Sequence, residues 1–542
     1  MYDILIKNGT IVDGTGTPWE KGDIAIKNGF IQEIGPSITS NTALVIDAGG
    51  KVVCPGFVDI HSHSDFSVLI DPKADSKVKQ GITTDVSGNC GISEGGPLLS
   101  KEALTQAKSR LEGTDIAVDW KYFDEYLNRI EKQGISINFA SYVGHSQIRM
   151  SVMGYKDGKP SQTELEEMKD LVRKSIKGGA VGLSTGLDQG LAPGCFADTE
   201  EVIELCKAAK DANPRAIYTS HTRNRQEKVL DAMDEFIHIV RASDIRGQIS
   251  HITPRFPDGD KTDQVVAKVE EARAEGLDIT CDVVVPAGKD YHTGMGFLHT
   301  QVMPDWALNE GTEKALSYLR DPKKRAEMKK TCNPLWGVIK LGLWDTLLLT
   351  YCRSRKDLEG KFFSEIAQIE QKDSWEAAYD ILANEGDNFT QVYIVSTKHT
   401  READTRKALL SPFVMMETDR ASSADYPPLS NFSLKPNSFD AFPRFLQRYV
   451  RDEKVLRLEE AVKKITFMPA KRLGFKNRGA IILHFAADVL VIDLDRLEAK
   501  ATFDNPVVYP KGIDYVIVNG KVVVNKGIHS GELAGKVLRL DD

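Results

Sequence analysis

Two histidines separated by one residue, His61 and His63, follow an apolar run that begins at Phe57. Alternate residues of a β-strand point to the same face, so a strand here would aim both imidazole rings at one point. Two converging imidazoles suit a borderline-soft cation such as zinc. The same short motif also occurs on exposed strand ends, so its meaning depends on what else the chain brings to this place.

Four further residues with metal-ligand or acid–base chemistry also lie where strand-like runs end. Cys90 sits in a glycine-flanked turn, His221 and His251 each follow a serine, and Asp419 ends an apolar run. A thiolate is a good zinc ligand, and a carboxylate beside a metal-activated water can act as general base and then protonate a leaving amine. Each residue alone has a structural alternative, such as a small buried cysteine or an aspartate helix cap. Six ligand-type residues exceed the needs of one four-coordinate site, so the pattern predicts one or two metal ions.

The elements that must position these residues alternate between strands and helices. Strand-like runs occur at 57–61, 84–87, 137–143, 180–184, 216–220, 248–250, 278–283, 392–395 and 413–417. Amphipathic helical patterns lie between many of them, at 162–177, 199–211, 227–242 and 262–275. This alternation predicts an α/β chain with a parallel sheet closed into a (β/α)₈ TIM-like barrel, and with one of the candidate strands outside it. The carboxyl ends of all barrel strands meet at one face, which would gather the six residues in one cup.

Both ends of the chain read as short strands joined by turns. The dipeptides Asn8-Gly9, Asn28-Gly29 and Asn519-Gly520 each follow a strand-like run and predict hairpins. We expect residues 1–54 and 480–542 to pair into one small β-sandwich domain, and residues 55–479 to form the barrel. A helix at 458–472 would close the barrel domain. The stretch at about 285–390 breaks the strand–helix rhythm and predicts an insertion that serves as a lid or an oligomer contact.

Composition bounds the class of protein. Of 542 residues, 41% are hydrophobic and 27% are charged, which is typical of a soluble globular protein. A net charge of −8 argues against nucleic acid as the main partner. Seven scattered cysteines do not form a disulfide framework, and neither a signal peptide nor an apolar run of membrane-spanning length is evident. We therefore expect a cytoplasmic protein without a membrane partner, and the choice between monomer and homo-oligomer stays open.

In combination, the 55–65 segment, Cys90, the two Ser-His strands and the Asp-ended strand resemble the amidohydrolase superfamily. Within it the chain resembles the D-aminoacylase (N-acyl-D-amino-acid deacylase) group through its second-strand cysteine, Gly144-His145, the 182–187 segment and its C-terminal tail. The resemblance covers the chain apart from about 285–410. It implies zinc held tightly by Cys90, His221 and His251, with His61 and His63 marking a weaker second site. It also implies that Asp419 is the catalytic acid/base.

The substrate-binding part of this resemblance is incomplete. Relatives that bind an amino-acid carboxylate typically have a lysine where this chain has Thr253, a Tyr-Pro-Tyr-like stretch in place of 283–286, and His-Pro-Arg in place of 435–437. The metal and water machinery is thus matched, but the carboxylate clamp is not. A different set of substrate contacts is predicted among polar residues near the strand ends: His145, Ser184, Arg223, Arg255, Lys289, Tyr291, His292 and Arg420.

The predicted function is that of a zinc-dependent amidohydrolase that cleaves a small-molecule N-acyl amide. The resemblance implies an N-acyl-D-amino acid, or a related N-acyl amine, as substrate. A second hypothesis is a cyclic-amide hydrolase of the hydantoinase or dihydroorotase kind. Those enzymes usually bridge two metals with a carboxylated lysine on the fourth strand, and residues 180–187 contain no lysine. A third hypothesis, motivated by the missing clamp, is a non-catalytic metal-binding barrel.

Overall fold

A parallel barrel positions the ligand-type residues. The computed structural model describes the chain except residues 289, 309, 432–434, 504 and 541–542. Short β8 and β9 are consecutive pieces of one strand, so the barrel has eight strands among the described residues. Its strands are β6 (Phe57–Asp59), β7 (Ile82–Ser87), β8 (Asn138–Ser141), β9 (Val143–Gly144), β10 (Gly182–Gly186), β11 (Ile217–His221), β12 (Arg246–Ile249), β13 (Ile279–Val284) and β17 (Val414–Glu417).

Two seams close the barrel. Strands β6-β7-β8 form one ladder and β9-β10-β11-β12-β13-β17 form the other. The Val181 N–H donates to the carbonyl of Ser141 at 3.0 Å, which joins β8 to β10. On the opposite side a parallel bridge between Ser62 and Arg420 joins the ends of β6 and β17. The predicted barrel is therefore confirmed, and the carboxyl ends of its parallel strands lie at one face.

Helices between the strands follow the predicted pattern. Helix α6 (Gln162–Lys177) begins at Ser161, whose hydroxyl accepts from the Glu164 N–H in a capping box. The predicted closing helix is instead two helices, because the backbone at Thr466 leaves the helical region. The other helices around the barrel are α1 (Ser67–Ile70), α2 (Asp75–Val78), α3 (Lys101–Arg110), α4 (Phe123–Gln133), α5 (His145–Met153), α7 (Thr199–Ala212), α8 (Val229–Ser243), α9 (Thr262–Ala274), α17 (Glu402–Leu410), α18 (Asn437–Phe445), α19 (Leu458–Ile465) and α20 (Phe467–Leu473).

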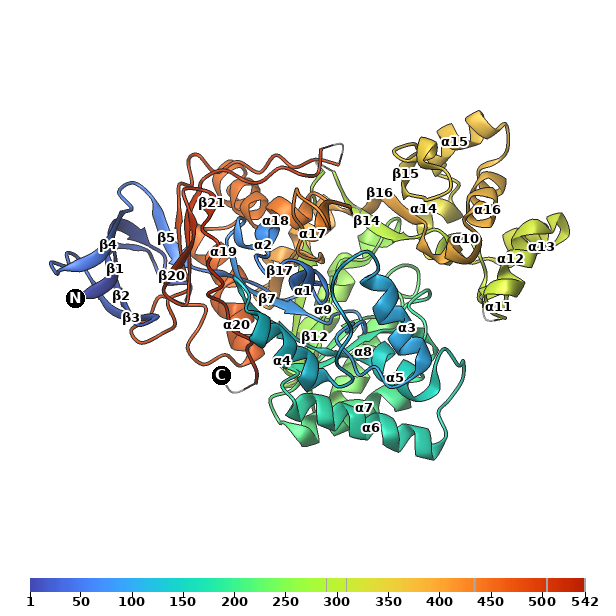
Figure 1. The fold of residues 1–542 in the computed structure, drawn as a ribbon, viewed down its shortest axis with the longest axis horizontal. Helices are drawn as coiled ribbons and strands as arrows, with labels where there is room; N and C mark the ends of the chain where they lie inside the picture. The colour runs from blue at the N-terminus through green and yellow to red at the C-terminus, as the bar shows by residue number, and fades with distance from the viewer. Residues whose placement is uncertain (289, 309, 432–434, 504, 541–542) are drawn as a thin grey trace.

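Strands from both chain ends form a small β domain beside the barrel (Figure 1). The order is β21-β20-β19-β18-β5-β1-β2-β3, with β4 also paired to β1, and the two ends of the chain meet where Cys54 faces Leu490. The predicted fold class, a barrel with a small β domain built from both chain ends, is confirmed. Its strands are β1 (Tyr2–Ile11), β2 (Glu20–Lys27), β3 (Phe30–Gly35), β4 (Thr42–Asp47), β5 (Val52–Pro55), β18 (Val489–Ile492), β19 (Ile513–Val518), β20 (Lys521–Asn525) and β21 (Ile528–His529).

One predicted hairpin was wrong. Asn28-Gly29 and Asn519-Gly520 do connect antiparallel strands, but β1 continues through Asn8 as a register shift. Asn8 adopts a φ of 63°, and its backbone N–H donates to the Asp23 carboxylate at 2.8 Å. Its side-chain amide donates to Asp47 at 3.0 Å. These side-chain acceptors stabilise a bulge where the dipeptide alone indicates a turn.

The insertion has a hydrophobic core of its own and projects from the barrel on the side away from the β domain (Figure 1). The ninth predicted strand lies here, because β16 pairs antiparallel with both β14 and β15. None of the described helices, here or elsewhere, is long and apolar enough to cross a membrane. The elements of the insertion are β14 (Tyr291–Phe297), α10 (His299–Val302), α11 (Asp305–Leu308), α12 (Thr312–Arg320), α13 (Pro322–Thr331), α14 (Gly337–Lys340), β15 (Leu347–Tyr351), α15 (Phe363–Glu370), α16 (Ser374–Glu385) and β16 (Tyr393–Arg401).

Candidate active site

The six ligand-type residues meet at the carboxyl ends of the barrel strands. They form two groups that share Cys90, and the ligand atoms within each group lie within 4.8 Å of one another. The first group is His61, His63, Cys90 and Asp419, and the second is Cys90, His221 and His251. The convergence predicted from spacing is thus present in the fold.

The backbone turns sharply where the strands deliver three of these residues. Cys90, His251 and Asp419 have φ values of 54°, 37° and 51°, in the left-handed region that non-glycine residues seldom adopt. Such conformations cost on the order of 1–3 kcal/mol each and persist where the surroundings enforce them, typically at functional sites. The strain is consistent with side chains held inward for chemistry.

Cys90 lies between the two histidine pairs. Its Sγ is 3.4 Å from His61 Nε2 and 3.5 Å from His251 Nε2, and the rings of His221 and His251 are 4.4 Å apart. Burial alone would raise the pKa of the Cys90 thiol, but the His61 charge and hydrogen bonds from neighbouring imidazoles hold that pKa well below its usual value. A thiolate next to imidazole nitrogens is a donor set that zinc accepts.

Asp419 stands at the accessible edge of the cup. Its Oδ1 is 3.1 Å from His63 Nε2, and both side chains keep about a quarter of their surface exposed, 26% for Asp419 and 28% for His63. Burial would raise the pKa of Asp419, but the hydrogen bond from His63 and the charges of His61 and Arg420 hold it well below the usual value. The carboxylate is therefore ionised and reachable by a small molecule.

Two buried carboxylates that the sequence reading missed hold the histidines in place. Glu417 Oε2 is 2.9 Å from His61 Nδ1, and Asp282 Oδ1 accepts the His251 backbone N–H at 2.5 Å. A usable signal existed for Glu417, because it is the acidic last residue of the apolar strand β17, two residues before Asp419. Such outer carboxylates orient imidazole ligands and set their tautomers.

Some of the predicted substrate contacts are fully buried, and others lie closer to the ligand-type residues. His145 and Ser184 are fully buried: His145 Nε2 lies 2.8 Å from Glu201, and the Ser184 hydroxyl accepts from the Gly91 N–H. The first contact joins α5 to α7, and the second holds the turn that carries Cys90. Neither side chain has an exposed atom that a substrate could reach. Arg420 is nearer the cup, with its guanidinium 3.6 Å from the Asp419 carboxylate.

The remaining predicted contacts lie on the loops after β11 and β12 and on β14 of the insertion. Tyr291 packs edge-on against Phe256, and burial lowers the pKa of His292 to about 3. Arg255 donates to Asp188 at 2.6 Å and lies 2.9 Å from His221 Nε2, whereas Arg223 pairs with Glu235. Lys289 lies outside the described residues.

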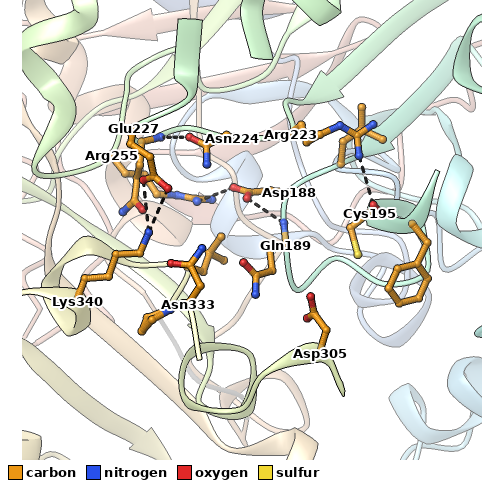
Figure 2. A pocket seen from close by; sticks show the side chains of 15 residues that line it. Asp188, Gln189, Cys195, Arg223, Asn224, Glu227, Arg255, Asp305, Asn333 and Lys340 are labelled. Carbon is orange, nitrogen blue, oxygen red and sulfur yellow. Dashed lines mark hydrogen bonds and ion pairs between the residues drawn. The ribbon is translucent and has the colours of Figure 1, made fainter. Parts of the chain in front are cut away.

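A cavity of ≈ 260 Å³ opens between the barrel loops and the insertion. Figure 2 shows Asp188 between Arg255 and Gln189, with Asp305, Asn333 and Lys340 of the insertion on the facing side. Because Asp188 and Arg255 also contact His221, they separate this cavity from the metal-type ligands. The insertion therefore completes a polar pocket next to the cup.

Comparison with known proteins gives consistent matches over the whole chain. The Amidohydrolase family model matches residues 44–296 and 406–524. An N-acyl-D-glutamate deacylase of Alcaligenes xylosoxydans xylosoxydans is 29% identical over 540 residues, covering 99% of this chain and 97% of that protein. The crystal structure of a D-aminoacylase is 27% identical, with a TM-score of 0.81 over 99% of this chain and 100% of that one. The structure of N-acyl-D-glutamate deacylase from Bordetella bronchiseptica, complexed with zinc and a phosphonate mimic of the tetrahedral intermediate, is also 27% identical, with a TM-score of 0.80 and 99% coverage of both chains.

Proposed function

This chain belongs to the amidohydrolase family, and from that membership and its site we propose that it hydrolyses the amide bond of an N-acyl amino acid with the help of zinc. The observation that carries the proposal is the convergence of a cysteine, four histidines and an accessible aspartate at the mouth of the barrel. Whole-length relatives that deacylate N-acyl-D-amino acids support the substrate class and its configuration.

The residues present fit a zinc ion. Cys90, His221 and His251 would hold it tightly, because a thiolate with two imidazoles leaves a fourth position open, as catalytic zinc sites require. His61 and His63, with Cys90 shared, would form a second, weaker site. When bound, zinc supplies a Lewis acid that acidifies water and polarises an amide carbonyl.

Asp419 moves the proton in this proposal. Its ionised carboxylate accepts a proton from the attacking water and then delivers it to the nitrogen of the leaving amine. The acyl carbon gains one oxygen from water as its bond to nitrogen breaks, so the products are a carboxylic acid and a free amino acid. His63, at 3.1 Å, holds the Asp419 carboxylate in its orientation.

The cyclic-amide hydrolase and the non-catalytic barrel predict different residues and different activities from those of the proposed enzyme. A cyclic-amide hydrolase with a carboxylated-lysine bridge would need a lysine on β10, and Gly182–Gly186 has none. A non-catalytic metal-binding barrel would bind zinc without turnover. Amine release and ring opening, measured together, therefore separate the three.

The test is hydrolysis of a substrate panel by zinc-loaded protein. The panel holds N-acetyl-D- and L-amino acids, carboxylate-free N-acyl amines, hydantoin and dihydrouracil. We expect amine release from N-acetyl amino acids, loss of release after chelation, and recovery when zinc is restored. Ring opening alone would favour the cyclic-amide hypothesis, and zinc binding without any turnover would favour the scaffold.

We expect Asp282→Asn to weaken zinc binding by about 10- to 100-fold, the range typical of lost outer-sphere partners. Asp282 accepts the His251 backbone N–H and lies 3.6 Å from His61 Nδ1, so the amide would misorient both ligands. Competition with a chromophoric chelator measures the affinity. Asp278→Asn is the matched control, since Asp278 precedes the same strand and pairs with Arg472 at its opposite end. Equal affinity in both variants would contradict the orienting role.

A further inference from the structure

Arg225 is a buried cation without a carboxylate partner. Its side chain is 6% exposed, and no carboxylate oxygen of the described residues lies within the 4.0 Å of an ion pair. Its Nη2 donates to the backbone carbonyl of Thr253 at 2.7 Å, and its Nε has no hydrogen-bond partner in the described part of the chain. Burying an unpaired charge costs several kcal/mol in a folded protein, so such a residue calls for an explanation.

The surroundings of Arg225 do not neutralise it. Asp188 is engaged by Arg255 at 2.6 Å, and Asp419 is engaged by His63 at 3.1 Å. Burial, reinforced by the charge of Arg255, lowers the pKa of Arg225 to about 9, while Asp188, Asp419 and Glu417 act in the opposite direction. Below that pKa the guanidinium stays charged, so it remains an anion-binding group at neutral pH.

Arg225 is anchored beside the strand end that carries His251, and its chain neighbours border the cavity. Arg225 follows His221 by four residues in the loop after β11, and its chain neighbours Asn224 and Gln226 line the ≈ 260 Å³ cavity. The Thr253 carbonyl that holds Nη2 lies two residues beyond His251. One bond to this carbonyl fixes the guanidinium and leaves the other N–H donors available to an anion.

We propose that Arg225 binds the carboxylate of the substrate and thereby restricts the enzyme to N-acyl amino acids over neutral N-acyl amines. The proposal rests on the function proposed above and names the residue that selects the substrate. A guanidinium recognises a carboxylate through paired N–H bonds, and such a bond made in a desolvated site is strong. The bound carboxylate supplies the counter-charge that the described protein residues do not.

The test compares matched substrates that differ only in charge. N-acetyl-D-alanine and N-acetyl-D-alaninol, with their L counterparts, are assayed for amine release by wild type, Arg225→Gln, Arg225→Lys and Lys228→Gln. Lys228 is exposed on the same loop and serves as the charge-loss control. We expect Arg225→Gln to lower kcat/KM for the carboxylate substrate about 100-fold, with less than about threefold change for the alaninol. Arg225→Lys, which keeps the charge, should lie between the two.

A binding measurement keeps this proposal separate from the proposed function. Calorimetry with N-acetyl-D-alanine and zinc-loaded Asp419→Asn protein reports the affinity for the carboxylate without turnover, and Arg225→Gln added to that background should remove the binding. An equal loss for both substrates, or wild-type preference for the alaninol, would overturn the role of Arg225. Absence of turnover in wild type, with carboxylate binding still lost in Arg225→Gln, would overturn the hydrolase proposal and leave Arg225 as an anion site.

Discussion

Replacing Asp419 by asparagine is expected to lower kcat by about 10³-fold while zinc content and fold stay unchanged. Asparagine keeps the size of the side chain but cannot accept a proton from water at neutral pH. Asp419 is suited to the role because its carboxylate is ionised, 26% exposed and hydrogen-bonded to His63. The measurement is amine release under saturating substrate, with zinc determined on the same sample.

A matched exchange six residues further along provides the control. Asp425 is exposed, and its carboxylate accepts a hydrogen bond from Tyr509, so Asp425→Asn should keep wild-type turnover. If Asp419→Asn retains full activity, Asp419 is not the acid/base. If it loses zinc together with activity, Asp419 acts as a ligand and the proton must move through another group.

The sequence predicted the features of the site that depend on strand ends. The side chains were expected to converge because parallel barrel strands end at one face, and the structure does bring together His61, His63, Cys90, His221, His251 and Asp419. The hydrophobic period of an element and the spacing of residues along it are local properties, so they can be determined from the sequence alone. The barrel helices, for instance α6 at Gln162–Lys177, follow from the same local patterns and caps.

Contacts between distant segments were not predictable in the same way. Asn8-Gly9 carries a hairpin signal, but Asp23 and Asp47 supply acceptors that stabilise a bulge instead. His145 follows a strand and was predicted to be a site residue. Its imidazole instead forms a hydrogen bond with Glu201, which lies on a helix of the next βα unit. These outcomes depend on partners 15 to 56 residues away, which no local pattern encodes.

The role proposed for Arg225 illustrates why substrate contacts are harder to predict from sequence than metal ligands. A metal site needs several ligand types at once, and their joint spacing is distinctive. A single arginine in a loop is usually exposed, and only the structure shows that this one is 6% exposed without a carboxylate partner among the described residues. The clamp predicted from the loops included Arg223, but that guanidinium is already paired with Glu235.

A buried lysine beneath the cup has the largest expected effect on stability. Lys77 is fully buried, with Nζ 2.7 Å from Asp59 and 3.1 Å from Asp85. It also donates to the Thr418 hydroxyl at 3.0 Å and to the Arg420 carbonyl at 2.9 Å. Asp59 belongs to β6 and Thr418 follows β17, so this ammonium group lies at the seam that closes the barrel.

Lys77→Met is expected to lower the free energy of unfolding by about 3–5 kcal/mol, because it leaves two carboxylates buried without their counter-charge. Urea denaturation of the zinc-loaded protein measures the change. Lys407→Met is the control, since Lys407 pairs with Asp263 at 2.7 Å, with side chains 46% and 70% exposed, and its loss should cost about 1 kcal/mol or less. Adding Asp85→Asn to Lys77→Met should recover part of the loss by removing one of the two unpaired charges. Equal costs for the two lysine variants would mean that closure of the barrel does not depend on the buried ion pair, and that the hydrogen bonds between β6 and β17 suffice.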